Sequence, residues 1–300
     1  MKNKKILGNI ILIFTAMIWG TAFAFQRVGM EHIGPVTFTA SRMTLAAIAV
    51  GIIAFVGSNA NDSATIDPAL RKKANIKGGL ALGFFLCSAS LFQQAGMVYT
   101  SAGKAGFITA MYILLVPIFN IIIFRKKSSL IVWISVFIGV IGMYLLCINE
   151  GLSLSKGDSL VAFCAILFSG HILCADHFVK NGDPVCISAI QFALTAAVSW
   201  VIAFIAETPT LSGITSALIP ILYCGLISGG LGYTLQIVGQ KYTDPTIASL
   251  LMSMESVFAV IGGAVILNEH LSTRELIGCV VMFVAIILVQ IPLPSSPSYS

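Results

Sequence analysis

Charged residues are scarce in this chain. Asp, Glu, Lys and Arg make up 10% of its 300 residues, whereas a soluble domain carries about 25%. Hydrophobic residues account for 57% of the sequence. So few charges do not cover the surface of a water-soluble protein of this size, and the composition therefore indicates a membrane protein.

Several signatures of catalytic or metal-binding proteins are also absent. The seven cysteines include no Cys-x-x-Cys pair and lie mostly inside apolar runs, so we expect neither a disulfide framework nor a metal site. No glycine-rich stretch has the context of a phosphate loop, and no cofactor is expected. The net charge of +5 comes from basic residues at the ends of apolar runs, where membrane topology explains them better than nucleic-acid binding.

Apolar runs of roughly 20 residues recur along the chain, long enough to cross a hydrocarbon core of about 30 Å as helices. The alternating pattern of a membrane barrel is missing. We therefore predict an all-α membrane protein with ten transmembrane helices. The predicted helices lie at residues 7–26, 35–56, 77–98, 102–124, 130–148, 158–178, 185–206, 214–238, 245–267 and 273–292.

The distribution of basic residues predicts the topology. Ten spans place both termini on one side of the membrane. Twelve of the 17 Lys and Arg residues fall on that side, four fall on the other, and Arg42 lies within the second span. By the positive-inside rule both termini are cytoplasmic, and we expect a multi-pass protein of the cell (inner) membrane.

The chain contains an internal duplication. The segment 236–269 matches the segment 93–126 without a gap, and Tyr112 stands where the second copy has Glu255. Identical residues lie 143 positions apart, as in Gln93 and Gln236, Gly96 and Gly239, Tyr99 and Tyr242, and Met111 and Met254. At an offset of 149, Gly8 matches Gly157, Phe14 matches Phe163 and Pro35 matches Pro184.

These matches predict two copies of five spans, residues 1–150 and 151–292, followed by a disordered tail at 293–300. Because five is odd, the copies have opposite orientations in the membrane. Inverted repeats are typical of secondary transporters and place the substrate site near the midplane, between the copies.

Four stretches, in order along the chain, resemble the EamA-type branch of the drug/metabolite transporter superfamily. They are AMIWGTAF at Ala16–Phe23, GPVTFTASRM at Gly34–Met43, YTSAGKAGFITAMYILLVP at Tyr99–Pro117, and the segment Gln240–Ser272. The chain departs from the family pattern at Ser256, where proline is common, and at Arg125-Lys126-Lys127, where an acidic residue often ends the fourth span. The resemblance implies ten helices, cytoplasmic termini and export of small metabolites or amino acids by alternating access.

Two charged residues lie inside predicted spans, where each costs about 2.5–3.5 kcal/mol and is expected to face protein or water. Burial disfavours the charged form of Glu255, which suits it to bind and release a proton or to contact a substrate ammonium group; it could also tie its span to a neighbour. Arg42 could clamp a substrate carboxylate, or pair with a carbonyl or reach the interface.

Uncharged polar and aromatic residues complete the predicted substrate site. Trp19 and Tyr112 lie in the middle of spans, away from the interfacial belt where Tyr233 is expected, and they could form an aromatic cavity wall or pack between helices. His171 is predicted to line the cavity or to serve as a packing residue. Gln93 and Gln236 are equivalent in the two copies, which suits a central site, although hydrogen bonding between helices is an alternative.

The sequence thus predicts a secondary active transporter with a small-molecule substrate, in the lipid bilayer, with proton coupling through Glu255. It is expected to be neither an enzyme nor a nucleic-acid-binding protein, and to be a monomer or a homodimer. A passive uniporter or facilitator is the main alternative, and a membrane-embedded lipid-modifying enzyme is a further one.

Overall fold

The computed structural model describes residues 2–57, 67–100, 102–126, 128–147, 155–266 and 272–290. Every regular element within these residues is a helix. The predicted tail at 293–300, the loop residues 58–66 and Lys127 lie outside the described residues.

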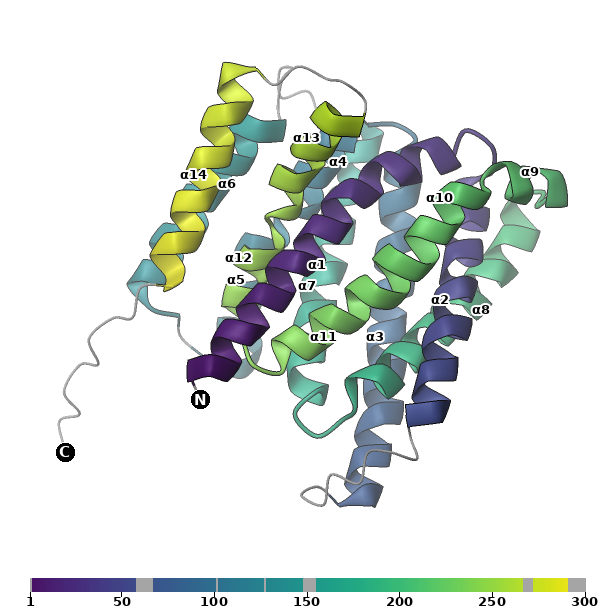
Figure 1. Cartoon of the computed structure of the whole chain (residues 1–300), viewed down its shortest axis with the longest axis horizontal. Coiled ribbons are helices and arrows are strands. Elements are labelled where there is room, and N and C mark those ends of the chain that lie inside the picture. The colour runs from purple at the N-terminus through teal and green to yellow at the C-terminus, as the bar shows by residue number, and fades with distance from the viewer. Residues whose placement is uncertain are drawn as a thin grey trace.

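The described residues of the first half form six helices, of which α4 and α5 are consecutive pieces of one predicted span (Figure 1). They are α1 (Lys2–Gly29), α2 (Pro35–Gly57), α3 (Pro68–Gly96), α4 (Ala102–Thr109), α5 (Tyr112–Phe124) and α6 (Leu130–Cys147).

The second half begins with two long helices and continues with shorter pieces. They are α7 (Lys156–Phe178), α8 (Pro184–Ala206), α9 (Leu211–Ser216), α10 (Leu218–Leu222), the π-helix η1 (Tyr223–Tyr233), α11 (Thr234–Gln240), α12 (Pro245–Met252), α13 (Glu255–Ile266) and α14 (Thr273–Gln290). Each predicted span therefore falls on one helix or on consecutive helices, but 102–124, 214–238 and 245–267 are not the continuous α-helices that were expected.

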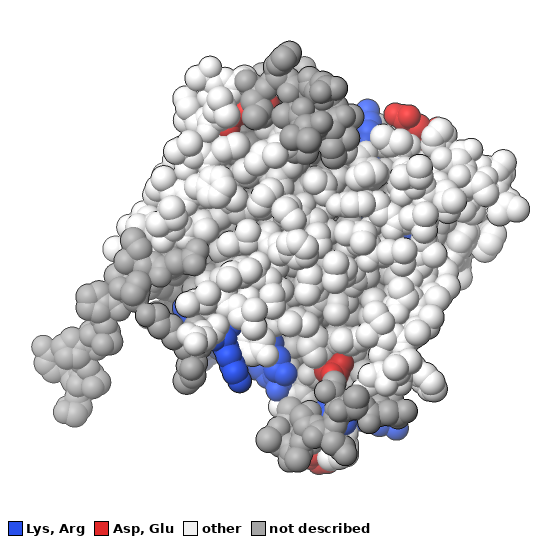
Figure 2. Space-filling model, in the orientation of Figure 1, with Lys and Arg blue, Asp and Glu red and all other residues white. Residues whose placement is uncertain are grey.

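The molecule is a multi-pass membrane protein. Seven helical stretches of the described chain are long and apolar enough to cross a membrane, and shorter apolar helices lie at 130–145 and 245–261. In Figure 2 the charged side chains gather at the two ends of the visible face, and a broad uncharged band separates them. Large apolar side chains such as Phe55, Ile205 and Ile123 are exposed, as lipid contact requires.

Two helices break at equivalent positions. α4 ends at Thr109 and α12 at Met252; α5 begins at Tyr112 and α13 at Glu255, so both boundaries repeat at an offset of 143. At each break a tight turn replaces the α-helical bond, since Met111 N–H donates to the carbonyl of Ile108 (3.2 Å) and Met254 N–H to that of Leu251 (3.3 Å).

Glycines set the shape of η1 and its approach to α2. A Cβ on Gly225 would lie 2.8 Å from the carbonyl oxygen of Arg42, and one on Gly229 would lie 2.9 Å from that of Cys224. An 11-residue π-helix is long for an element that usually forms single turns, often at functional sites.

The carboxylate of Glu207, at the end of α8, caps the N-terminus of α2. It accepts hydrogen bonds from Val36 N–H (2.9 Å), Thr37 N–H (2.8 Å) and the Thr37 hydroxyl (2.6 Å). The equivalent helix α8 is capped instead by its own Asp183, which accepts from Val185 and Cys186 N–H (both 2.9 Å).

We expect Glu207→Ala to lower the free energy of unfolding by about 1–3 kcal/mol, because three donors at the start of α2 lose a charged acceptor. Thermal unfolding of the purified protein in detergent measures the effect. Glu31→Ala, which removes a nearby exposed carboxylate, is the matched control; equal melting temperatures for both variants would contradict the capping role.

Candidate substrate cavity

A small cavity of about 40 Å³ lies among α1, α2, α3, α4, α5, α7, η1, α11 and α13. Six of the seven residues predicted for the substrate site line it: Trp19, Arg42, Gln93, Tyr112, Gln236 and Glu255. The fold thus brings these residues together from both halves of the chain. That they bind substrate remains a prediction.

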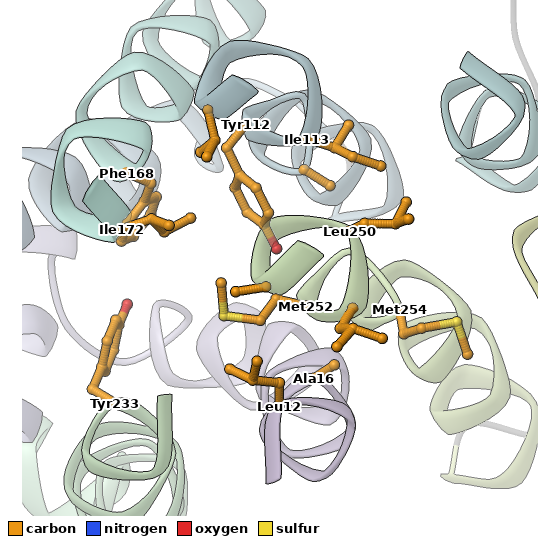
Figure 3. Close-up of a cluster of buried hydrophobic side chains, with 14 of the residues drawn as sticks. Leu12, Ala16, Tyr112, Ile113, Phe168, Ile172, Tyr233, Leu250, Met252 and Met254 are labelled. Carbon is orange, nitrogen blue, oxygen red and sulfur yellow. The ribbon is translucent and has the colours of Figure 1, made fainter. Parts of the chain in front are cut away.

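Tyr112 and Glu255 meet in this cavity. Each is the first residue of a helix that follows a break, and the Tyr112 hydroxyl donates a hydrogen bond to Glu255 Oε1 (3.1 Å). Figure 3 shows the hydroxyl groups of Tyr112 and Tyr233 pointing into the space between the helices. The two positions related by the internal repeat are thus direct neighbours in space.

The aromatic wall is built on α1 and η1. Trp19 Nε1–H donates to the carbonyl oxygen of Ser228 (3.1 Å), and its ring lies 4.7 Å from that of Tyr233. Tyr233 was expected in the interfacial belt, but it is buried and lines the cavity. The signal in the sequence was the glycine-rich GGLG stretch directly before it, which lies within the π-helix η1.

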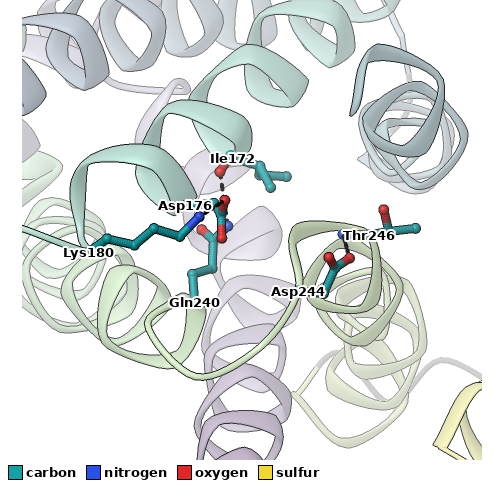
Figure 4. Close-up of polar contacts among 6 residues, drawn as sticks. All are labelled: Ile172, Asp176, Lys180, Gln240, Asp244 and Thr246. Atoms are coloured by element: carbon teal, nitrogen blue, oxygen red, sulfur yellow. Dashed lines mark hydrogen bonds and ion pairs between the residues drawn. The ribbon is translucent and has the colours of Figure 1, made fainter. Parts of the chain in front are cut away.

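The two glutamines differ in their contacts. Gln93 Nε2 donates to the Thr109 hydroxyl (3.2 Å), whereas Gln236 Nε2 donates to Gln240 Oε1 (3.0 Å). Gln240 Nε2 in turn donates to the carbonyl oxygen of Ile172 on α7 (2.9 Å; Figure 4). Hydrogen bonding between helices, the alternative interpretation, therefore describes the contact of Gln93, whereas the contact of Gln236 lies within α11. Both side chains also line the cavity.

His171 does not line the cavity, contrary to one of the two sequence interpretations. It is fully buried, with Nε2 2.9 Å from Gln191 Oε1 and its ring 5.7 Å from that of Tyr233. One turn before it on the same helix, Phe168 occupies the cavity wall. His171 is thus a packing residue behind Tyr233.

Two equivalent contacts join the halves of the chain at opposite ends of the cavity helices. The side chains of Asn9 and Thr243 are 3.0 Å apart where α1 begins and α11 ends, and the Thr100 hydroxyl donates to Asp158 (2.7 Å) where α3 ends and α7 begins. Asn9 is equivalent to Asp158 at the offset of 149, and Thr100 to Thr243 at 143. We call these contacts the α1–α11 latch and the α3–α7 latch.

Glycines bring the backbones together at both latches. A Cβ on Gly8 would lie 2.9 Å from the carbonyl oxygen of Gly239, and one on Gly157 would lie 2.6 Å from that of Gly96. These four glycines are also related by the two offsets. In Figure 1, α3 starts at the lower end of the molecule, and α1 also starts in the lower half. The α1–α11 latch, near the start of α1, and the α3–α7 latch, near the end of α3, therefore lie toward opposite ends of the molecule.

These features define a helical membrane protein with a polar, aromatic-walled cavity between two similar halves. The model of the EamA-like transporter family matches residues 6–148 and again residues 155–291. The chain therefore belongs to the EamA-like transporter family.

Individual relatives are also named as transporters. An uncharacterized transporter of Archaeoglobus fulgidus is 25% identical over 96% of this chain and 87% of its own. The uncharacterized transporter YoaV of Bacillus subtilis is 21% identical over 93% of this chain and 94% of its own. A chloroplastic WAT1-related protein of Arabidopsis thaliana is 24% identical over 94% of this chain and 69% of its own. A protein of known crystal structure shares the fold, with a TM-score of 0.75 at 19% identity over 94% of this chain and 96% of that one.

Proposed function

We propose that this family member is a secondary active transporter that exports a small metabolite or amino acid through the plasma membrane by alternating access. The observation that carries the proposal is the meeting of two equivalent helix breaks at one cavity, marked by the hydrogen bond between Tyr112 and Glu255. Discontinuous helices around a central site are a recurring feature of secondary transporters.

Two inverted five-helix repeats, residues 1–150 and 151–292, are the proposed architecture. It is supported by the repeated helix breaks, by the two latches and by the two matches to the family model. In such a transporter, opening one latch while the other stays closed exposes the cavity to one side of the membrane at a time.

Both termini are proposed to lie in the cytoplasm. The excess of Lys and Arg on the predicted cytoplasmic side supports this orientation, and in Figure 2 basic side chains gather at the lower end of the visible face. Asp176 of α7 contributes to this end as an ion pair with Lys180, which lies in the turn directly after the helix (2.8 Å; Figure 4). Salt screening leaves such an exposed pair little net energy.

Glu255 is the proposed proton site. It is 4% exposed, and no described cation lies within ion-pair distance of it, so its negative charge is only partly compensated by the Tyr112 hydroxyl. Protonation removes that charge, and the cavity can then change its exposure without moving an isolated anion through the protein.

The test is an untargeted screen of cells that overproduce the protein, in which mass spectrometry identifies compounds enriched in the medium. The compound is then followed in proteoliposomes with and without a proton gradient. Export that exceeds its own gradient only when protons flow the other way supports the proposal. Equilibration alone would instead establish a passive uniporter, and enrichment of a chemically modified lipid would favour an enzyme.

A further inference from the structure

Arg42 is a buried cation that the described structure leaves uncompensated. We infer that the substrate carries an anionic group, a carboxylate, phosphate or sulfonate, which the Arg42 guanidinium binds. The inference rests on the proposed transport function and adds the chemical class of the substrate to it.

The first step is that no described residue forms a hydrogen bond or an ion pair with Arg42. Its side chain is 2% exposed, its Nε is buried without a hydrogen bond, and no carboxylate of the described chain lies within ion-pair distance. The nearest charge-stabilising contact is the ring of Phe38, 5.9 Å from the guanidinium carbon. An arginine is always charged, so burying it without a partner is costly unless something else supplies the anion.

The second step compares Arg42 with its equivalent in the other half. Gln191 stands at the same position of α8, and its Oε1 lies 2.9 Å from His171 Nε2, away from the cavity. The position therefore accommodates an uncharged side chain that has one partner inside the protein, through its Oε1, while its Nε2 is buried without a hydrogen bond. The first half instead carries a permanent cation that faces the cavity, which points to a role outside helix packing.

The third step concerns the rest of the cavity. Trp19, Phe168 and Tyr233 present aromatic surface, and Glu255 already accepts a hydrogen bond from Tyr112. Among the described residues, Arg42 is thus the charged group of the cavity that has neither a hydrogen bond nor an ion pair, and its guanidinium fork matches carboxylate and phosphate oxygens in two-point contacts. The substrate that fits is an organic anion with an apolar or aromatic body.

The experiment extends the export screen to four proteins: the wild type, Arg42→Lys, Arg42→Gln and the control Arg274→Gln, which removes an arginine of α14 outside the cavity. Compounds are quantified in the medium and in the cells. We expect the enriched compound to carry an anionic group. Its enrichment is expected to fall at least tenfold in Arg42→Gln, to fall less in Arg42→Lys, which keeps the charge but loses the fork, and to persist in Arg274→Gln.

A second measurement avoids mutation and any folding defect. The identified compound is compared with its amide or ester as a competitor of wild-type transport, and only the charged form is expected to compete. Enrichment of a compound without an anionic group, undiminished export by Arg42→Gln, or equal competition by the neutral analogue would overturn the inference while transport itself stands. If the wild type moves no compound in either direction, the proposed function fails as well.

Discussion

Replacing Glu255 by glutamine is expected to abolish the effect of a proton gradient on transport. In proteoliposomes the wild type should export several-fold faster when protons flow in the opposite direction. Glu255→Gln should show a ratio of about one with and without the gradient, because the amide keeps the size and the Tyr112 contact but binds no proton. Exchange of substrate across the membrane without a gradient should continue.

Two further variants make this experiment specific. Glu255→Asp retains a titratable carboxyl group and should keep part of the gradient effect. Glu31→Gln removes an exposed carboxylate outside the cavity and should behave like the wild type. Gradient-driven transport by Glu255→Gln would remove this carboxylate from the coupling step, and a passive uniporter would become the better description if the wild type also ignored the gradient.

Adding a side chain at the latch glycines is expected to stop transport and to fix the protein in opposite states. In Gly157→Leu the new Cβ would lie 2.6 Å from the Gly96 carbonyl oxygen, and in Gly8→Leu it would lie 2.9 Å from that of Gly239. The obstacles are backbone atoms and do not rotate away. Each variant should therefore hold one latch open and lower transport at least tenfold.

Accessibility of the cavity distinguishes the two variants. A cysteine at Ala22, which lines the cavity, is introduced into a cysteine-free protein and labelled with a membrane-impermeant thiol reagent from either side. Gly157→Leu should react from the side opposite the termini, and Gly8→Leu from the side of the termini.

The matched control for the latch variants is Gly51→Leu, since a Cβ on Gly51 meets nothing within 4 Å. It should transport and label like the parent protein. If Gly157→Leu and Gly8→Leu label from the same side, or transport as well as Gly51→Leu, then the latches do not govern access to the cavity.

Most of the helices could be predicted from the sequence, because membrane-spanning segments are recognisable as long apolar runs. The offset of 143 also paired Tyr112 with Glu255 before any contact between them was known. The breaks themselves were not predictable from residue type, since neither glycine nor proline occupies positions 110–111 or 253–254. The tight turns there depend on how the surrounding helices pack.

The remaining errors share a physical cause, which is that contacts distant in the sequence decide them. Tyr233 faces the cavity because η1 winds widely against α2, and His171 turns away because Gln191 offers it a partner. The latches were also missed, although Gly8, Gly157, Gly96 and Gly239 had been matched in pairs. Matching shows which positions correspond, but it does not show that α1 touches α11 while α3 touches α7.

The π-helix makes the two halves mechanically unequal. Its counterpart by the offset of 143, residues 80–90, is part of the continuous α-helix α3. A π-helix forms i→i+5 hydrogen bonds in place of the i→i+4 bonds of an α-helix, so this stretch changes its length if it exchanges one winding for the other. If the two halves exchange conformations during the transport cycle, the π-helix belongs to only one of them, and the two end states differ in energy even without substrate. A preferred resting side would then be built into the backbone itself.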